Sequence, residues 1–129
     1  MADIPADLVD LLEHPVVGHL ATVRPDGAPQ VEPMWFLFDG EHVRFTHTTT
    51  RAKYRNLQHN PRMALTVTDP ENPYRFLGLR GRLVATEPDP TGAFYQQLDT
   101  RYTGAEHPPP PDSADRVVLV MSVEKVVRK

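Results

Sequence analysis

The feature that most constrains the fold of this chain is a series of short apolar segments separated by turn residues. Pro25-Asp26-Gly27 and Asp39-Gly40 are two of these separators, and both favour a tight reversal of the chain. Between the separators, apolar and polar residues alternate or run together in the manner of β-strands. Six strands are predicted in this way, at residues 16–24, 30–38, 43–48, 63–68, 74–86 and 116–127. Six or more strands with few long connections predict a small, mostly antiparallel β-barrel with a few helices.

Three short helices complete the predicted fold, at residues 4–12, 51–59 and 91–102. In the last of them, Phe94, Leu98 and Tyr102 recur every four residues and form one apolar face. The middle helix is expected to end at Asn60-Pro61, because the residue before a proline disfavours helical geometry. A chain of 129 residues with these elements fits a single domain over residues 1–129.

Several predicted strands carry apolar residues on both faces, and the strand at 16–24 is the clearest example. A barrel of this size hides only one face inside itself, so the second face needs another cover. A homodimer interface is the simplest candidate. In the strand at 74–86, Gly78 and Gly81 predict bulges or close backbone approach.

The composition excludes several classes of protein. The chain has no cysteine, which excludes disulfides and thiolate metal sites, and its net charge of -3 argues against a general nucleic-acid binder. Its six histidines lack metal-ligand spacing, and no nucleophile elbow, dinucleotide-binding or phosphate-loop motif is present. We therefore expect no metal site. The N-terminus has no signal pattern and no apolar run is long enough for a membrane span, so a soluble, cytoplasmic protein is expected.

The segment Thr48–Leu57 places cations where a helix usually carries carboxylates. A threonine triplet at 48–50 is expected to cap the helix, and Arg51, Lys53 and Arg55 fall in its first two turns. The N-terminus of a helix already carries a partial positive charge, so these cations are unfavourable alone. They become favourable if a phosphate lies on the helix axis, held by backbone N–H groups, hydroxyls and charged side chains. We predict an anion site here; the alternative is a solvated basic face.

The strand at 30–38 contains a second informative feature, because Pro33 falls in its middle. Proline lacks the N–H that a strand ladder needs, so it forces a break, a bulge or an edge position. A broken ladder leaves backbone groups free to bond the amide edge of a flat heterocycle, with Trp35 and Phe36 as apolar walls. The alternative is an edge strand whose aromatic residues belong to the core.

The segment 69–82 adds three arginines, of which Arg80 and Arg82 share one face of a strand. This pair is a candidate for binding a second anionic group, although a solvated face or salt bridges between subunits would also explain it; the third arginine is Arg75. The chain thus offers an anion site and a ring-binding strand without an obvious acid–base set. Chemistry carried by a cofactor fits that combination, because the cofactor supplies the reactive atom.

The order of these features resembles the pyridoxamine 5′-phosphate oxidase-like split β-barrels, which bind FMN or the deazaflavin coenzyme F-420. The resemblance covers nearly the whole chain and looks closest to the small F-420-dependent oxidoreductases. The FMN-using oxidase has adjacent Arg-Lys in its phosphate clamp, whereas Ala52 separates Arg51 from Lys53 here. The motifs that carry the resemblance are Gly18-His19-Leu20-Ala21-Thr22, Asp26-Gly27-x-Pro29, Pro33-Met34-Trp35-Phe36, Arg51–Leu57, Asn60-Pro61-Arg62 and Gly78-Leu79-Arg80-Gly81.

The resemblance implies a cofactor site at the interface of a homodimer. It implies that Arg51 and Lys53 bind the cofactor phosphate, that Thr46, Thr48 and Thr50 assist, and that Pro33, Met34, Trp35 and Phe36 hold the ring system. Arg55, Arg75 and Arg80 are the candidates for a basic lane that would bind the anionic polyglutamate tail of F-420.

The function implied is that of an oxidoreductase, in which reduced coenzyme F-420 passes a hydride to a small unsaturated organic acceptor. The alternatives are an FMN-binding oxidoreductase of the same fold and a non-catalytic carrier or sensor of a flavin or deazaflavin. No residue is assigned as a catalytic acid, although water or Tyr74 could supply a proton. The substrate is expected to be a small molecule.

Overall fold

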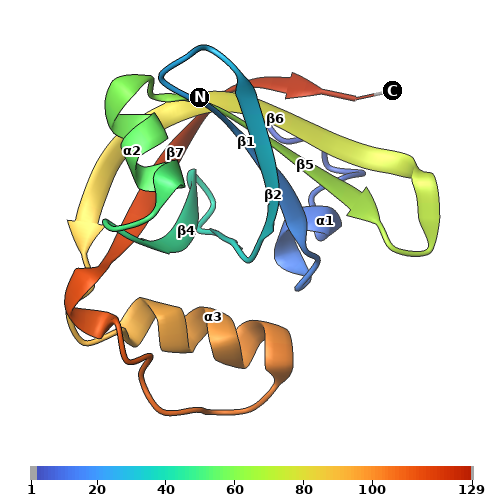
Figure 1. Cartoon of the computed structure of the whole chain (residues 1–129). Helices are drawn as coiled ribbons and strands as arrows, with labels where there is room; N and C mark the ends of the chain where they lie inside the picture. The colour runs from blue at the N-terminus through green and yellow to red at the C-terminus, as the bar shows by residue number, and fades with distance from the viewer. Residues whose placement is uncertain (1–2, 129) are drawn as a thin grey trace.

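Within residues 3–128, which the computed structural model describes, seven strands form one antiparallel sheet (Figure 1). The order of the strands across the sheet is β2-β1-β5-β6-β7-β4-β3. The prediction of a mostly antiparallel barrel is confirmed, with one strand more than the six located from the sequence. The strands are β1 (Gly18–Val23), β2 (Pro29–Met34), β3 (Leu37–Phe38), β4 (His42–Thr48), β5 (Arg62–Asp69), β6 (Asn72–Pro88) and β7 (Arg116–Val127).

The extra strand arises because the predicted strand at 30–38 is interrupted. β2 ends at Met34 and β3 begins at Leu37, yet these two strands lie at opposite edges of the sheet. Only Trp35 and Phe36 join them, so the sheet must curl until its two edges approach each other. The predicted edge position of Pro33 is confirmed, since β2 pairs with β1 on one side and with no other described strand.

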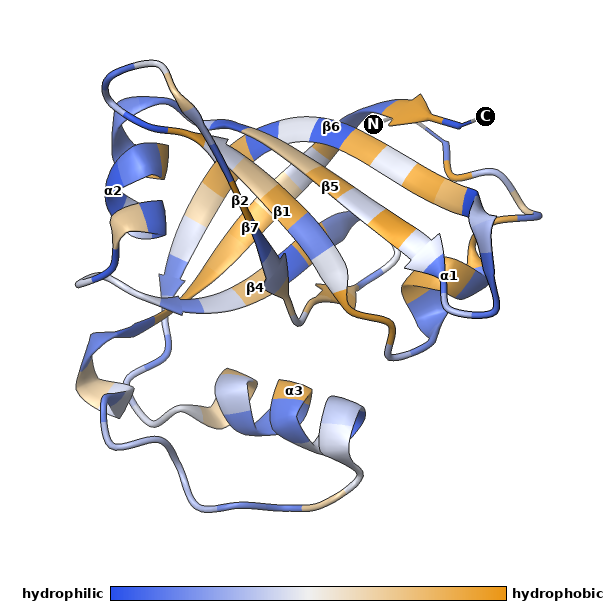
Figure 2. Cartoon of the chain, turned by 45° about the vertical axis from the view of Figure 1, so that its right-hand side comes forward, coloured by the Kyte–Doolittle hydropathy of each residue, from blue (hydrophilic) through white to orange (hydrophobic). Residues whose placement is uncertain are grey.

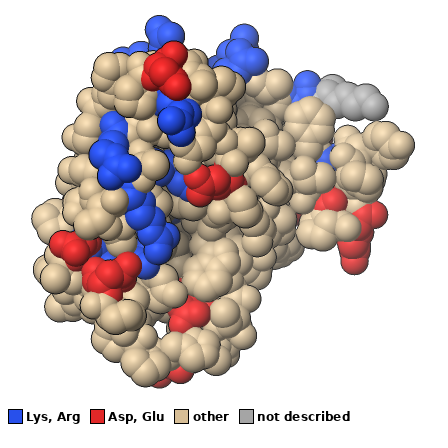
Figure 3. Space-filling view, in the orientation of Figure 1, with Lys and Arg blue, Asp and Glu red and all other residues tan. Residues whose placement is uncertain are grey.

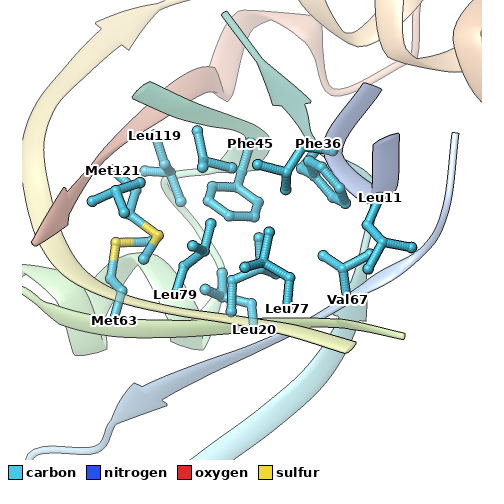
Figure 4. Close-up of a cluster of buried hydrophobic side chains, with 14 of the residues drawn as sticks. Leu11, Leu20, Phe36, Phe45, Met63, Val67, Leu77, Leu79, Leu119 and Met121 are labelled. Carbon is cyan, nitrogen blue, oxygen red and sulfur yellow. The ribbon is translucent and has the colours of Figure 1, made fainter. Parts of the chain in front are cut away.

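The inside of the curled sheet holds the hydrophobic core (Figure 4). Phe45 on β4 and Phe36 in the β2–β3 connection are fully buried there, together with leucines from β1, β5, β6 and β7. The alternation of apolar residues along each strand produces this arrangement, because alternate side chains point to the same face. Figure 2 shows the hydrophobic residues concentrated on the strands, whereas α2 and α3 are largely hydrophilic.

In the described part of the chain, three α-helices flank the barrel: α1 (Asp10–Glu13), α2 (Ala52–His59) and α3 (Ala93–Thr103). The prediction of α2 is confirmed, including its end before Asn60. The helix expected at 4–12 is wrong in extent, because the chain before Asp10 forms turns in which Leu8 N–H bonds to Pro5 O at 3.0 Å. In Figure 1, α2 lies on the barrel, where it contacts β1, and α3 lies below β4.

β6 and β7 cross more closely than side chains would normally allow. A Cβ atom on Gly81 would lie 1.6 Å from the carbonyl oxygen of Ser122, and one on Gly78 would lie 3.2 Å from Val127 O. The register between the two strands shifts at Gly81. Both predictions for these glycines, a bulge and close backbone approach, are confirmed at Gly81. The connection from β5 to β6 is a tight reversal, since Asn72 already pairs with Asp69.

The second apolar face is only partly covered in the single chain. On β1, Leu20 and Thr22 are buried, whereas His19 on the opposite face is exposed and Ala21 is half-buried. The expectation that this strand is buried on both sides is therefore wrong for one chain. Val31 on β2 and Val84 on β6 are also exposed large apolar residues, by 64% and 50%. Burial of this face in a homodimer stays a prediction.

Candidate functional site

An open cleft lies between β2, β4, the start of α2 and the neighbouring parts of α3 and β7, with a volume of about 530 Å³. Figure 3 shows Lys and Arg side chains gathered over α2, beside a hollow in the surface. Four parts of the chain meet there, at residues 30–35, 46–53, 95 and 116. The residues that line the cleft are Gln30, Glu32, Pro33, Met34, Trp35, Thr46, His47, Arg51, Ala52, Lys53, Tyr95 and Arg116.

The start of α2 presents an uncapped helix N-terminus to this cleft. Arg51 is the N-cap residue in extended conformation, and no side chain caps the helix. The expected threonine cap is wrong, because Thr48 and Thr50 bond each other through their hydroxyls at 3.1 Å. The first turn also lacks acidic residues. Among the residues that the structure describes, none forms a hydrogen bond or ion pair with the Arg51 side chain, which lines the cleft.

Lys53 is held inside the cleft by a carboxylate from another strand. Its side chain is 3% exposed, and its Nζ lies 2.9 Å from Glu32 Oε2 and 3.3 Å from Met34 Sδ. Gln30 donates a hydrogen bond to the other oxygen of Glu32 and accepts one from Asn56 Nδ2 at 3.1 Å. Hydrogen bonds from Lys53 and Gln30 hold the pKa of Glu32 below its usual value. Alternate residues of β2 thus bind α2 to the edge of the sheet.

Arg116, at the start of β7, is a further cation of the cleft that the sequence analysis missed. It is 7% exposed, and its Nε and Nη2 lie 3.0 and 3.4 Å from the two oxygens of Asp112. Its guanidinium also lies 4.6 Å from the centre of the Tyr95 ring and donates to Thr46 Oγ1 at 3.4 Å. The only local signal was the spacing of Asp112 and Arg116, four residues apart, which indicates an ion pair without indicating a cleft.

His47 lies among these cations with an unpartnered ring nitrogen. The residue is 4% exposed, and its buried Nε2 has no hydrogen-bond partner in the described part of the chain. Burial and the charges of Lys53, Arg51 and Arg116 together lower the pKa of His47 to about 4, against a smaller opposite effect of Glu32. The imidazole is therefore neutral at neutral pH. A buried nitrogen without a partner beside several cations fits a site that receives a polar group.

Aromatic side chains form the wall of the cleft near α3. Trp35 stacks on Tyr102 with ring centres 5.3 Å apart, and it lies 6.3 Å from the Tyr95 ring. Trp35 lines the cleft, as predicted for a ring wall, whereas Phe36 is fully buried in the core. The backbone N–H of Phe36 donates to the Tyr102 hydroxyl at 3.1 Å, and that hydroxyl also bonds Val16 O. Phe36 is thus neither a wall nor a source of free backbone groups, which corrects the expectation.

The remaining predicted residues lie outside the cleft lining. Thr48 and Thr50 lie next to it, and Arg55 donates to Thr50 O at 3.1 Å on the exposed side of α2. Arg75 forms ion pairs with Asp10 and Asp69 and donates a hydrogen bond to Asp7 O. It lines a different hollow, together with Tyr74 and Arg128. Arg80 lines a separate, mainly apolar hollow on the outside of the barrel. The structure therefore brings Pro33, Met34, Trp35, Thr46, Arg51 and Lys53 together, and it does not bring Arg75 and Arg80 to them.

Two kinds of feature are absent from residues 3–128. No group of three or more His, Asp or Glu side chains is arranged to hold a metal ion. No helix within the same residues has the length and hydrophobicity needed to cross a membrane.

Comparison with known proteins adds a family and a set of similar structures. The family model described as pyridoxamine 5′-phosphate oxidase matches residues 4–128. A solved structure named F-420 reductase is 54% identical, with 98% of this chain and 100% of that chain covered and a TM-score of 0.94. No curated protein sequence matches the chain.

More distant structures share the fold. A conserved hypothetical protein of Mycobacterium tuberculosis is 22% identical, with 98% of this chain and 84% of that chain covered and a TM-score of 0.75. General stress protein 26 of Bacillus anthracis is 16% identical, with 92% and 88% of the two chains covered and a TM-score of 0.71.

Proposed function

The chain belongs to the pyridoxamine 5′-phosphate oxidase family, and from that premise we propose that it is an oxidoreductase that uses reduced coenzyme F-420. In this proposal a hydride passes from the deazaflavin to a small unsaturated organic acceptor. The single observation that carries it is the cleft in which Arg51, Lys53 and Arg116 meet beside the Trp35 ring. Similarity to a structure named F-420 reductase supports the choice of coenzyme.

The residues of the cleft fit the phosphate and ring of such a coenzyme. Arg51 has no anionic partner in the described chain, and the N-terminus of α2 beside it has no side-chain cap. The buried Nε2 of His47 also lacks a partner. A phosphate would satisfy these groups with charge-assisted hydrogen bonds. We assign Arg51, Lys53 and Arg116 to the phosphate, and Trp35 with the backbone of Pro33 and Met34 to the ring.

When bound, the coenzyme supplies the hydride and becomes oxidised, and the acceptor gains that hydride and one proton. The protein's own residues bind and orient. Trp35 is held by its stacking on Tyr102, so it offers a rigid apolar surface to a flat ring. Tyr74 lies with Asp7 and Arg75 around another hollow, so we assign the proton to water. We also propose that a second copy of the chain covers the exposed apolar face of the barrel and completes the site.

The proposal is tested by fluorescence titration of the purified protein with F-420. Replacing Arg51 by alanine removes a charge-assisted contact worth about 1.5–3 kcal/mol, so the dissociation constant should rise by roughly tenfold or more. Arg24→Ala is the matched control, since Arg24 pairs with Asp26 in an exposed turn outside the cleft. Equal affinity of the Arg51→Ala variant and the wild type would refute the assignment.

The same titration separates the alternative functions. Tighter binding of FMN than of F-420 would show the FMN-using variant of the proposal. Tight binding of reduced F-420 with no acceptor-dependent oxidation across a library of small unsaturated compounds would show a carrier or sensor.

A further inference from the structure

The charges of the cleft are nearly balanced before any ligand binds. Lys53 pairs with Glu32 at 2.9 Å, and Arg116 pairs with Asp112 at 3.0 Å. Arg51 is the only cationic side chain lining the cleft that lacks a carboxylate partner among the described residues. His47 is neutral, because its pKa lies at about 4. Three cations against two carboxylates leave one unpaired cationic side chain, Arg51, beside the partial positive charge at the N-terminus of α2.

That balance discriminates between two kinds of phosphate. A phosphate diester carries one negative charge, whereas a terminal monoester carries nearly two at neutral pH. The Glu32 carboxylate, which is 46% exposed, lines the same cleft as Arg51, so a second negative charge on the ligand would share the cleft with it. Two negative charges in one cleft repel each other, and the repulsion is stronger there than in bulk water because a partly buried site is screened less.

We propose that the cleft selects a singly charged phosphodiester over a phosphomonoester, and that Glu32 is the residue that sets this selectivity. The inference rests on the proposed function, in that a phosphate must bind in the cleft. It goes beyond it by assigning the choice between phosphate classes to one carboxylate on β2. Coenzyme F-420 has a diester phosphate and FMN a monoester, so the same carboxylate also favours the deazaflavin coenzyme.

The test uses two probes with one ring system. Deazaflavin mononucleotide carries the F-420 ring and a terminal phosphate monoester, and its phosphate methyl ester is a diester with one charge fewer. Both fluoresce and both lack the polyglutamate tail, so the change with pH in the ratio of their dissociation constants reports the phosphate charge. At about pH 8 the wild type should bind the methyl ester several-fold more tightly, and at about pH 5, where the monoester has lost its second charge, the preference should vanish.

Three variants of the full chain identify the residue responsible. Glu32→Gln removes the charge and should shift the ratio toward the monoester by about tenfold at pH 8. Glu32→Asp keeps the charge and should keep the wild-type preference. Glu124→Gln is the matched control, because Glu124 pairs with Arg82 on the outside of the barrel and its loss should leave the ratio unchanged. Circular dichroism confirms that each variant is folded before titration.

The outcomes separate this inference from the proposed function. If neither probe binds the wild type, the proposed function fails and the selectivity fails with it. If both probes bind and Glu32→Gln weakens both equally, Glu32 only positions Lys53 and the inference is wrong. A wild type that prefers the monoester at pH 8 would also overturn it.

Discussion

The pair formed by Glu32 and Lys53 gives the sharpest prediction about stability. Lys53 is almost fully buried, so its ammonium group depends on the carboxylate 2.9 Å away for compensation of its lost hydration. Glu32 is 46% exposed and can still reach water without Lys53. The two single substitutions should therefore differ. Glu32→Gln leaves a buried cation without its counter-charge, whereas Lys53→Met leaves a carboxylate that remains solvated.

The magnitude follows from the unequal burial of the two partners. Breaking a fully buried pair costs about 3–5 kcal/mol, and an exposed pair contributes about 0.2–1 kcal/mol. With one partner buried and the other half-exposed, Glu32→Gln should lower the free energy of unfolding by about 1–3 kcal/mol. Lys53→Met should change it by less than about 1 kcal/mol, because methionine replaces the apolar stem. The double variant should match Lys53→Met.

Urea denaturation of the wild type, both single variants and the double variant measures this cycle. The assay is run near neutral pH, where Glu32 is ionised because its pKa is lowered from 4.5. A coupling energy near zero would refute the reasoning, as would a larger loss of stability from Lys53→Met than from Glu32→Gln.

Three further predictions concern the barrel and the aromatic wall. Gly81→Ala places a Cβ atom 1.6 Å from Ser122 O, so the free energy of unfolding measured by thermal denaturation should fall by about 2–4 kcal/mol. An unchanged melting temperature would contradict the close crossing of β6 and β7. The pKa of His47 is about 4 in the folded protein, against 6.5 for an unperturbed histidine. Between these values only the unfolded chain binds the proton, so the free energy of unfolding should fall as the pH drops from 6.5 toward 4. The dependence of the free energy of unfolding on pH in this range should be weaker in the His47→Gln variant. Tyr102→Phe removes the hydroxyl that accepts the buried N–H of Phe36 at 3.1 Å. The free energy of unfolding measured by urea denaturation should therefore fall by about 1–3 kcal/mol. A decrease below about 0.5 kcal/mol would contradict the importance of this contact.

Elements with strong local signals could be predicted from the sequence. The strand β7 was predicted with its observed bounds, and α2 was predicted to within one residue, because a proline fixes its end and alternation fixes the strand. Gly81 was also interpreted correctly, since only glycine tolerates such a close crossing of strands.

Features that depend on closure of the barrel could not be predicted. Nothing near Lys53 in the sequence shows that its carboxylate comes from Glu32 on β2, because that contact forms only when the edge strand packs on α2. Arg116 enters the cleft for the same reason, from a strand that begins more than fifty residues after α2 ends. The sequence indicated that Phe36 belongs to the site, whereas the connection from β2 to β3 places its side chain in the hydrophobic core. Local patterns indicate elements; the partners across the cleft depend on tertiary packing.

The most direct test of the account is a crystal structure of the protein bound to reduced F-420. We expect the coenzyme phosphate within hydrogen-bond distance of the Arg51 guanidinium and the first amides of α2, with the deazaflavin ring beside Trp35. A phosphate bound elsewhere, with Arg51 directed into solvent, would contradict the account.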